Sequence, residues 1–188
     1  MADVTISDLN LGVPAGSHVI PYSTGTGGTT NKTLVSSLTA GLATTNDVRF
    51  IGCVVSNSAA QVISGNTITI LNFNTETIDT DSFHSNTTNN SRITIPTGLG
   101  GMYLIIGTAT TSTTSAYNKN SILIFRNGVA AIRNDTSIGG NGVDVGMNIS
   151  FLTALQAGDY IELAAFCQSF WSQNQIIGQT LSLTRIAP

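Results

Sequence analysis

The stretch NFNTETIDTDSFH, residues 72–84, holds four side chains that can carry chemistry. Glu76, Asp79, Asp81 and His84 fall close together in a chain of which only 9% of residues are charged. Two carboxylates can act as the acid and the nucleophile or base that cleave a glycosidic bond. Carboxylates beside a histidine can instead hold a divalent cation. The stretch therefore raises two hypotheses, an active site and a metal site.

The pattern of the preceding residues argues against a catalytic pair. If the strand predicted at residues 66–73 continues extended through TITILNFNTET, residues 67–77, successive side chains point to opposite faces. Glu76 and Asp79 are an odd number of residues apart, so we expect them on opposite faces, where they cannot flank one glycosidic bond. We therefore predict no catalytic residues and no enzymatic activity, and keep a depolymerase only as an alternative.

Asp79 and Asp81 share a face of such a strand, which makes them weak candidates for metal ligands. However, the ligand order, the glycine and the final glutamate of a calcium loop are missing. One histidine without patterned cysteines is also a poor zinc site. Asp side chains commonly bond to backbone amides where a strand ends, and His84 could pin the loop that follows. We favour this structural role and predict no bound metal and no cofactor.

A second candidate site lies in FCQSFWSQNQ, residues 166–175. An aromatic ring beside amide side chains can hold a sugar through stacking and hydrogen bonds. Trp171, Gln173 and Asn174 are therefore candidate contacts for a host glycan. The alternative, which we favour, is that this stretch forms an interface or a core loop.

The composition argues against several kinds of partner. The net charge is −3 and the seven Lys and Arg residues are scattered, so no basic stripe is available and we expect no nucleic-acid partner. No apolar stretch approaches the roughly 18 residues that span a bilayer, so we expect no membrane insertion. The first thirty residues lack the pattern of a secretory signal, so we expect folding in a cytosol. Cys53 and Cys167 are then free buried thiols, with one disulfide or a reactive thiol as alternatives.

Strand patterns occupy most of the chain after residue 47. Polar turn clusters separate many short runs rich in β-branched residues, which favours a sandwich or a closed barrel. The sharpest local signal is Asn127-Gly128, which predicts a tight hairpin turn. The predicted strands span residues 48–56, 66–73, 91–96, 101–112, 121–125, 129–133, 145–155, 159–166 and 179–186.

The first 45 residues have a different character. They are polar, rich in Gly and Thr, and too loosely patterned to form a core. Leu34, Leu38 and Leu42 are four apart, which would suit one short amphipathic helix. We place a domain boundary near residues 43–47, with an N-terminal arm at 1–45 and a β domain at 46–188. Such an arm would become ordered by lying on a sister subunit or on a larger assembly.

The β domain resembles the C1q/TNF-like jelly-roll domain, in particular the versions found in bacteriophage structural proteins. The resemblance runs from about Val48 to Ile186. It rests on the Phe73-Asn74 strand end, the Ile95-Pro96 to Gly101-x-Tyr103 step and Leu155-x-x-Gly158-Asp159-x-Ile161-x-Leu163. It implies an all-β antiparallel jelly-roll sandwich that forms a homotrimer, with residues 72–84 as scaffold. The uncharged strand at 145–155 is our candidate for burial on both faces, by the core and by a neighbouring subunit.

The arm is similar to the particle-attachment segments of phage head and tail fibre proteins. The resemblance therefore implies a virion structural protein, assembled in the host cytoplasm. In this interpretation it is a homotrimeric knob that residues 1–45 attach to a major capsid or tail protein, as a capsid decoration or a short fibre. The alternative function is a receptor-binding module that recognises a host surface glycan through exposed loops.

Overall fold

The structure is a computed structural model of the chain. It describes residues 19–23, 30–34, 49–112, 118–138, 144–168 and 173–188. The chain divides into two units, Met1–Arg49 and Phe50–Pro188. The described residues form strands and turns and include no helix. Consequently none of them lies in a helix that is long and apolar enough to span a membrane.

The first unit contains one pair of antiparallel strands, β1 (Val19–Ser23) and β2 (Thr30–Leu34). The predicted helix is wrong at its first leucine, because Leu34 ends strand β2. The remaining leucines of that pattern, Leu38 and Leu42, lie outside the described residues. The predicted attachment role of residues 1–45 stays a prediction.

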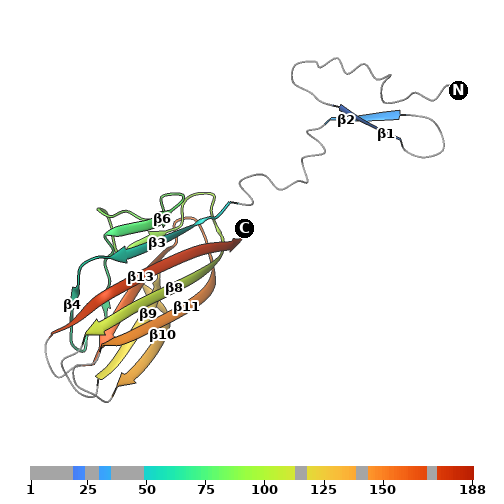
Figure 1. Ribbon diagram of the computed structural model, residues 1–188. Helices are drawn as coiled ribbons and strands as arrows, with labels where there is room; N and C mark the ends of the chain where they lie inside the picture. Colours follow the sequence, from blue (N-terminus) through green and yellow to red (C-terminus); the bar gives the residue numbers. More distant parts are fainter. Residues whose placement is uncertain (1–18, 24–29, 35–48, 113–117, 139–143, 169–172) are drawn as a thin grey trace. The chain divides into compact units, whose positions relative to one another are not determined.

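The second unit consists of two antiparallel sheets (Figure 1). The first, called here the five-stranded sheet, has the order β10-β9-β12-β5, with β7 also pairing with β12. Its strands are β5 (Thr69–Ile70), β7 (Arg92–Thr94), β9 (Asn118–Arg126), β10 (Val129–Ile138) and β12 (Tyr160–Cys167).

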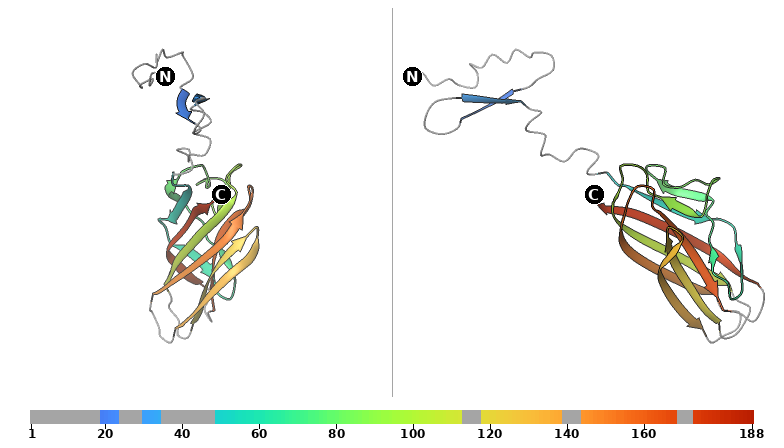
Figure 2. Two further views of the ribbon diagram at one scale, coloured as in Figure 1. Left: turned by 90° about the vertical axis from the view of Figure 1, so that its right-hand side faces the viewer. Right: turned by 180° about the vertical axis from the view of Figure 1, so that it is seen from behind.

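The second, called the six-stranded sheet, has the order β11-β8-β13-β3-β6, with β4 also pairing with β13. Figure 2 shows the long strands β8, β11 and β13 of this sheet from two further sides. The strands are β3 (Gly52–Asn57), β4 (Gln61–Ser64), β6 (Thr75–Asp79), β8 (Gly101–Ser112), β11 (Val145–Leu155) and β13 (Gln173–Ala187).

The core lies between the two sheets and draws on both. Strand β8 buries every second residue from Tyr103 onward, as expected for a strand with one face on a core. Gly107 shows how closely the sheets approach: a Cβ added there would lie 2.4 Å from Cδ1 of Leu163 on β12. Cys53 and Cys167 are both free and buried in this core, which confirms the prediction of free buried thiols.

Two sequence signals are confirmed as structural features. Asn127 and Gly128 have φ angles of 52° and 78° and connect β9 to β10, as a tight hairpin turn requires. Asp159 accepts hydrogen bonds from the backbone N–H of Gln156, at 2.8 Å, and from the Asn127 side chain, at 2.7 Å. It also pairs with Arg126 at 2.8 Å. Asp159 therefore fastens the hairpin to the turn that precedes β12.

The predicted strands agree unevenly with the structure. The bounds of β8 and β11 match the prediction, because long runs with clear turn residues at both ends define them. The run at 66–73 contains only the two residues of β5, and residues 48–51 precede β3. Strands β4 and β6 were not predicted, since both are short and β6 is polar.

Candidate functional site

The acidic cluster lies at strand β6, on the edge of the six-stranded sheet. Glu76 pairs with Val55 of β3 and Asp79 with Cys53, and the register shifts between them. Because Val55 and Cys53 both face the core, the residues opposite them share one side of β6. The prediction that Glu76 and Asp79 point to opposite faces is therefore wrong, because a β-bulge inserts one extra residue between them.

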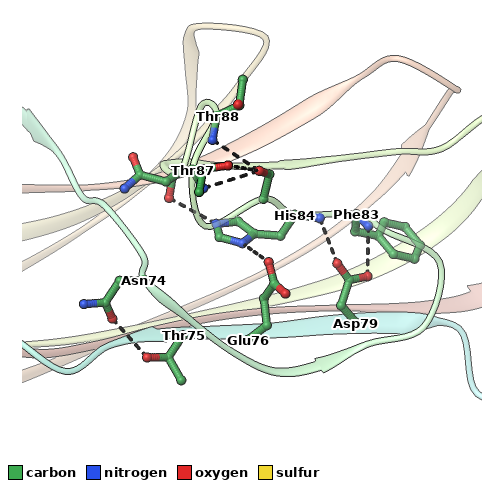
Figure 3. A network of polar contacts seen from close by, with 10 residues as sticks. Asn74, Thr75, Glu76, Asp79, Phe83, His84, Thr87 and Thr88 are labelled. Carbon is green, nitrogen blue, oxygen red and sulfur yellow. Dashed lines mark hydrogen bonds and ion pairs between the residues drawn. The ribbon is translucent and has the colours of Figure 1, made fainter.

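The carboxylates of Asp79 and Asp81 nevertheless accept hydrogen bonds from residues of the connection between β6 and β7. Asp79 accepts hydrogen bonds from the backbone N–H of Phe83, at 2.9 Å, and of His84, at 3.0 Å (Figure 3). Asp81 accepts a 2.6 Å bond from the Thr80 hydroxyl. This is the strand-end role that the sequence analysis favoured, since the carboxylate satisfies amides that leave the sheet.

His84 holds the same connection from its other side. Its Nδ1 lies 2.9 Å from Oε1 of Glu76, and its Nε2 lies 3.1 Å from the carbonyl oxygen of Asn90. The His84 side chain is fully buried, and the ring of Phe73 meets it edge-on with centroids 6.4 Å apart. The prediction that His84 pins this loop is confirmed.

The described residues bear on two further kinds of chemistry, metal binding and thiol reactivity. In the described part of the chain, no three or more His, Cys, Asp or Glu side chains are placed to hold a metal ion. Burial, reinforced by Asp79 and Glu76, raises the pKa of the Cys53 thiol to about 12. Burial also raises the pKa of the Cys167 thiol to about 11. Both thiols are therefore protonated at neutral pH, and a protonated thiol is a poor nucleophile and metal ligand.

The predicted glycan contacts fall in and beside a gap in the described residues. Trp171 lies outside the described residues. Gln173 and Asn174 are the first residues of β13, and their backbones pair with Ser64 and Ile63 of β4. The contact of these three residues with a glycan stays a prediction.

The outer side of the six-stranded sheet is called here the uncharged face. The sequence predicted an uncharged surface for β11 alone, and the structure extends it over neighbouring strands. Leu104, Ile106 and Leu152 point outward and are 36%, 41% and 53% exposed. Leu104 lies opposite Leu152 on the neighbouring strand. A second row crosses the sheet in register through Ile106, Ser182, Val54 and Ile78.

The rest of the uncharged face is made of small polar and apolar side chains. Thr and Ser residues such as Thr108, Thr180 and Ser150 fill the positions between the aliphatic rows. No Lys, Arg, Asp or Glu occurs in β3, β8 or β11. The signal in the sequence was the strict alternation of these strands, whose outward positions are aliphatic or hydroxyl-bearing instead of charged.

The outer side of the five-stranded sheet, called the charged face, differs in kind. Glu162 accepts hydrogen bonds from Arg92 and Ser91, both at 3.0 Å, and Arg92 stacks 4.0 Å over the ring of Tyr160. At the other end of the sheet, Asp135 pairs with both Lys119, at 2.7 Å, and Arg133, at 2.6 Å.

Polar contacts lower the pKa of two carboxyl groups, those of Asp135 and Asp159. The Lys119 ammonium, followed by the Ser121 hydroxyl and Arg133, holds the pKa of Asp135 well below its usual range. The backbone amide of Gln156, followed by Asn127 and Arg126, lowers the pKa of Asp159. Charges on this side of the molecule are therefore satisfied within the chain.

Comparison with known proteins agrees with the jelly-roll class at the level of the fold. No protein-family model and no curated protein sequence matches the chain. Among solved structures, the globular domain of zebrafish complement 1qA superposes with a TM-score of 0.52 at 12% identity, covering 72% of this chain and 97% of that one. The structure of Eiger TNF from S. frugiperda gives 0.51 at 10% identity, covering 73% and 93%. The second unit is thus an all-β, antiparallel C1q/TNF-like jelly roll.

Proposed function

We propose that this protein is a bacteriophage virion structural protein: a homotrimeric jelly-roll knob that its N-terminal arm attaches to the particle. The observation that carries the proposal is the uncharged face. It spans β3, β8 and β11 of one sheet, strands that carry no charged side chain, whereas the outer side of the other sheet carries several paired charges. A surface of this kind is suited to burial against further copies of the same chain.

The energetics of the uncharged face favour association over solvation. Each aliphatic side chain that leaves water contributes roughly 25 cal/mol per Å² of apolar area. Burying Thr and Ser side chains costs little when their hydroxyls find partners, and Thr108 and Thr180 already bond to each other at 2.5 Å. No charge has to be desolvated, which removes the largest penalty that opposes an interface.

Assembly also gives the sheet a protected edge. Strand β11 is the last strand of the six-stranded sheet, and an open edge strand invites pairing with other chains. In the single chain β11 buries one face and exposes the other, including Leu152. The predicted burial of β11 on both faces therefore requires the neighbouring subunit, and it stays part of this proposal.

The arm supplies the proposed link to the particle. Residues 1–45 are polar and rich in Gly and Thr, and their similarity to phage attachment segments supports binding to a major capsid or tail protein. A homotrimer would present three such arms, so weak single contacts would combine into a much higher overall affinity.

The proposal is tested by separating assembly from attachment. The full chain and a chain lacking residues 1–45 are compared for mass in solution and for co-sedimentation with purified phage particles. We expect both to be trimers and only the full chain to bind particles. Equal particle binding by both chains would contradict the role of the arm. Retained binding of the truncated trimer to host cells or glycans would instead support the receptor-binding function.

A further inference from the structure

His84 lies between two groups that can only accept hydrogen bonds. Its Nδ1 faces the Glu76 carboxylate at 2.9 Å and its Nε2 faces the Asn90 carbonyl at 3.1 Å. Figure 3 shows the ring between β6, which carries Glu76, and the connection that leads to β7. Because the side chain is fully buried, water cannot readily replace either partner.

The number of donors on the ring then determines how many contacts it can make. A neutral imidazole has one N–H donor and one bare nitrogen acceptor, whereas the imidazolium has two donors. A backbone carbonyl and an ionised carboxylate both lack a proton to donate to a bare nitrogen. Only the doubly protonated ring therefore satisfies Glu76 and Asn90 together, with a charge-assisted bond on the Glu76 side.

Titratable groups on several neighbouring elements surround this connection. Strand β6 contributes the carboxylates of Glu76 and Asp79, the latter bonded to the backbone N–H of His84. Strand β3 contributes the Cys53 thiol, which is neutral because its pKa is raised to about 12. Arg92, at the start of β7, is paired with Glu162. Of the groups named, Glu76 is the one whose side chain bonds directly to the ring.

We propose that the connection between β6 and β7, residues 80–91, is a proton-dependent clamp whose closed form requires the doubly protonated ring of His84. In that form the ring ties Glu76 on β6 to Asn90 and so closes the base of the connection. Loss of one ring proton leaves two acceptors for one donor. One contact must break, which loosens the exposed tip at residues 86–89.

The direction of the pH dependence follows from the number of N–H donors on the ring. The clamp is closed at a pH where the ring carries both protons, and it opens as rising pH removes one of them. Acid that protonates the Glu76 carboxylate also weakens it, because the opposite charge is then lost. The clamp acts within one chain and does not depend on the proposed trimer or on the arm.

Amide hydrogen exchange of the full chain tests the clamp. Protection of residues 80–91, corrected for the intrinsic pH dependence of exchange, is compared at about pH 5.5 and about pH 8.5, which bracket the ordinary histidine range. We expect protection to fall about tenfold at the higher pH, the size of one lost charge-assisted hydrogen bond. The hairpin at residues 126–129, which Asp159 holds without a histidine, serves as the internal reference and is expected to stay constant.

Three variants distinguish a contact that depends on pH from one that is present at every pH. In His84→Gln the pH dependence of protection is expected to disappear. In Glu76→Gln it is also expected to disappear, because an amide at this position can donate to the bare Nδ1 of the neutral ring, so both contacts of the ring remain at the higher pH. Ser85→Ala is the matched control, because Ser85 Oγ accepts bonds from the backbone N–H groups of Thr87 and Thr88. It should loosen the tip equally at both pH values. A wild-type protection that stays constant, with His84→Gln equally loosened at both pH values, would overturn the proposal.

The protonation of the two ring nitrogens of His84 can also be observed directly by nitrogen NMR. This measurement tests the clamp even if His84→Gln does not fold. His18 is the only other histidine in the chain, so the ring nitrogens of His84 can be observed alone in His18→Gln. Two protonated nitrogens at the lower pH and one at the higher pH would support the clamp. A single neutral tautomer at both pH values would rule it out.

Discussion

The two outer faces of the jelly roll handle polarity in opposite ways. The charged face of the five-stranded sheet carries Arg, Lys, Asp and Glu side chains that pair with one another within the chain. The uncharged face of the six-stranded sheet presents aliphatic rows separated by Thr and Ser. Both faces belong to twisted antiparallel sheets over one core, so the fold itself does not require the difference.

The difference bears on the proposed function, which requires one face that stays in water and one that contacts another copy of the chain. Charged groups that are already paired gain little from a further protein surface, and desolvating them costs free energy. Removing aliphatic side chains from water lowers the free energy of the system. Desolvating a hydroxyl group costs much less free energy than desolvating a charge, provided that the hydroxyl finds a hydrogen-bond partner. Under the proposed function, the charged face stays in water and the uncharged face forms the contacts between copies of the chain. The predictions below test this division, beginning with the largest effect.

A single charge placed on the uncharged face should abolish assembly. Ile106 is 41% exposed at the middle of β8, so Ile106→Asp leaves the core intact but would bury an unpaired carboxylate in the interface. Such a charge costs several kcal/mol. We expect a folded monomer by light scattering, with an unchanged circular dichroism spectrum.

Val129 provides the matched control on the other sheet. It is 70% exposed beside the Asn127-Gly128 turn, so Val129→Asp adds the same charge to a face that already carries charges. We expect this variant to keep the mass of the wild type. If both variants lost assembly, or if neither did, the assignment of the two faces would be wrong.

A change on the charged face should instead weaken folding and spare assembly. Glu162 is buried and bonds to Arg92 and Ser91. We expect Glu162→Ala to lower the free energy of unfolding by roughly 1–3 kcal/mol, because its partners lose their acceptor. Chemical denaturation at a fixed chain concentration measures the loss. An unchanged midpoint would mean that water replaces this pair without cost.

Acid should produce a smaller loss of the same kind. The pKa values of Asp135 and Asp159 are lowered in the folded chain, so their contribution to stability is present above about pH 4, the usual carboxyl range, and decreases as pH falls below it. Asp159→Asn should be less stable than the wild type at neutral pH, and the gap should narrow in acid. A gap that is independent of pH would show that the charge of Asp159 does not contribute.

The sequence was sufficient to predict the framework of the fold but not its irregularities. The alternation in β8 and β11 is long, and the Asn127-Gly128 turn requires positive φ angles that few residue pairs adopt readily. In contrast, Leu71 and Phe73 are fully buried outside any strand. Burial alternates from Leu71 to Asn74 as it would in the predicted strand, but these residues lie outside the strands of both sheets. The alternation therefore predicted which side chains are buried and not which backbone groups pair.

The acidic cluster shows the same limit at the level of a site. Residue types were enough to predict that Asp79 and His84 fasten a loop. Glu76 and Asp79 were predicted to point to opposite faces of a strand, but they share one side of β6. The extra residue of a bulge between them shifts the alternation of side chains by one position. The acceptor partner of His84, the Asn90 carbonyl, is a backbone group that no side-chain pattern marks.

The most direct test of the central claim is the mass of the purified full chain by sedimentation equilibrium over a wide concentration range. Our account predicts a species of three times the 19.5 kDa chain mass, which Ile106→Asp converts to the single-chain mass. A wild-type protein that remains monomeric at the highest concentration would contradict the account, because the uncharged face would then be exposed to water in the native state.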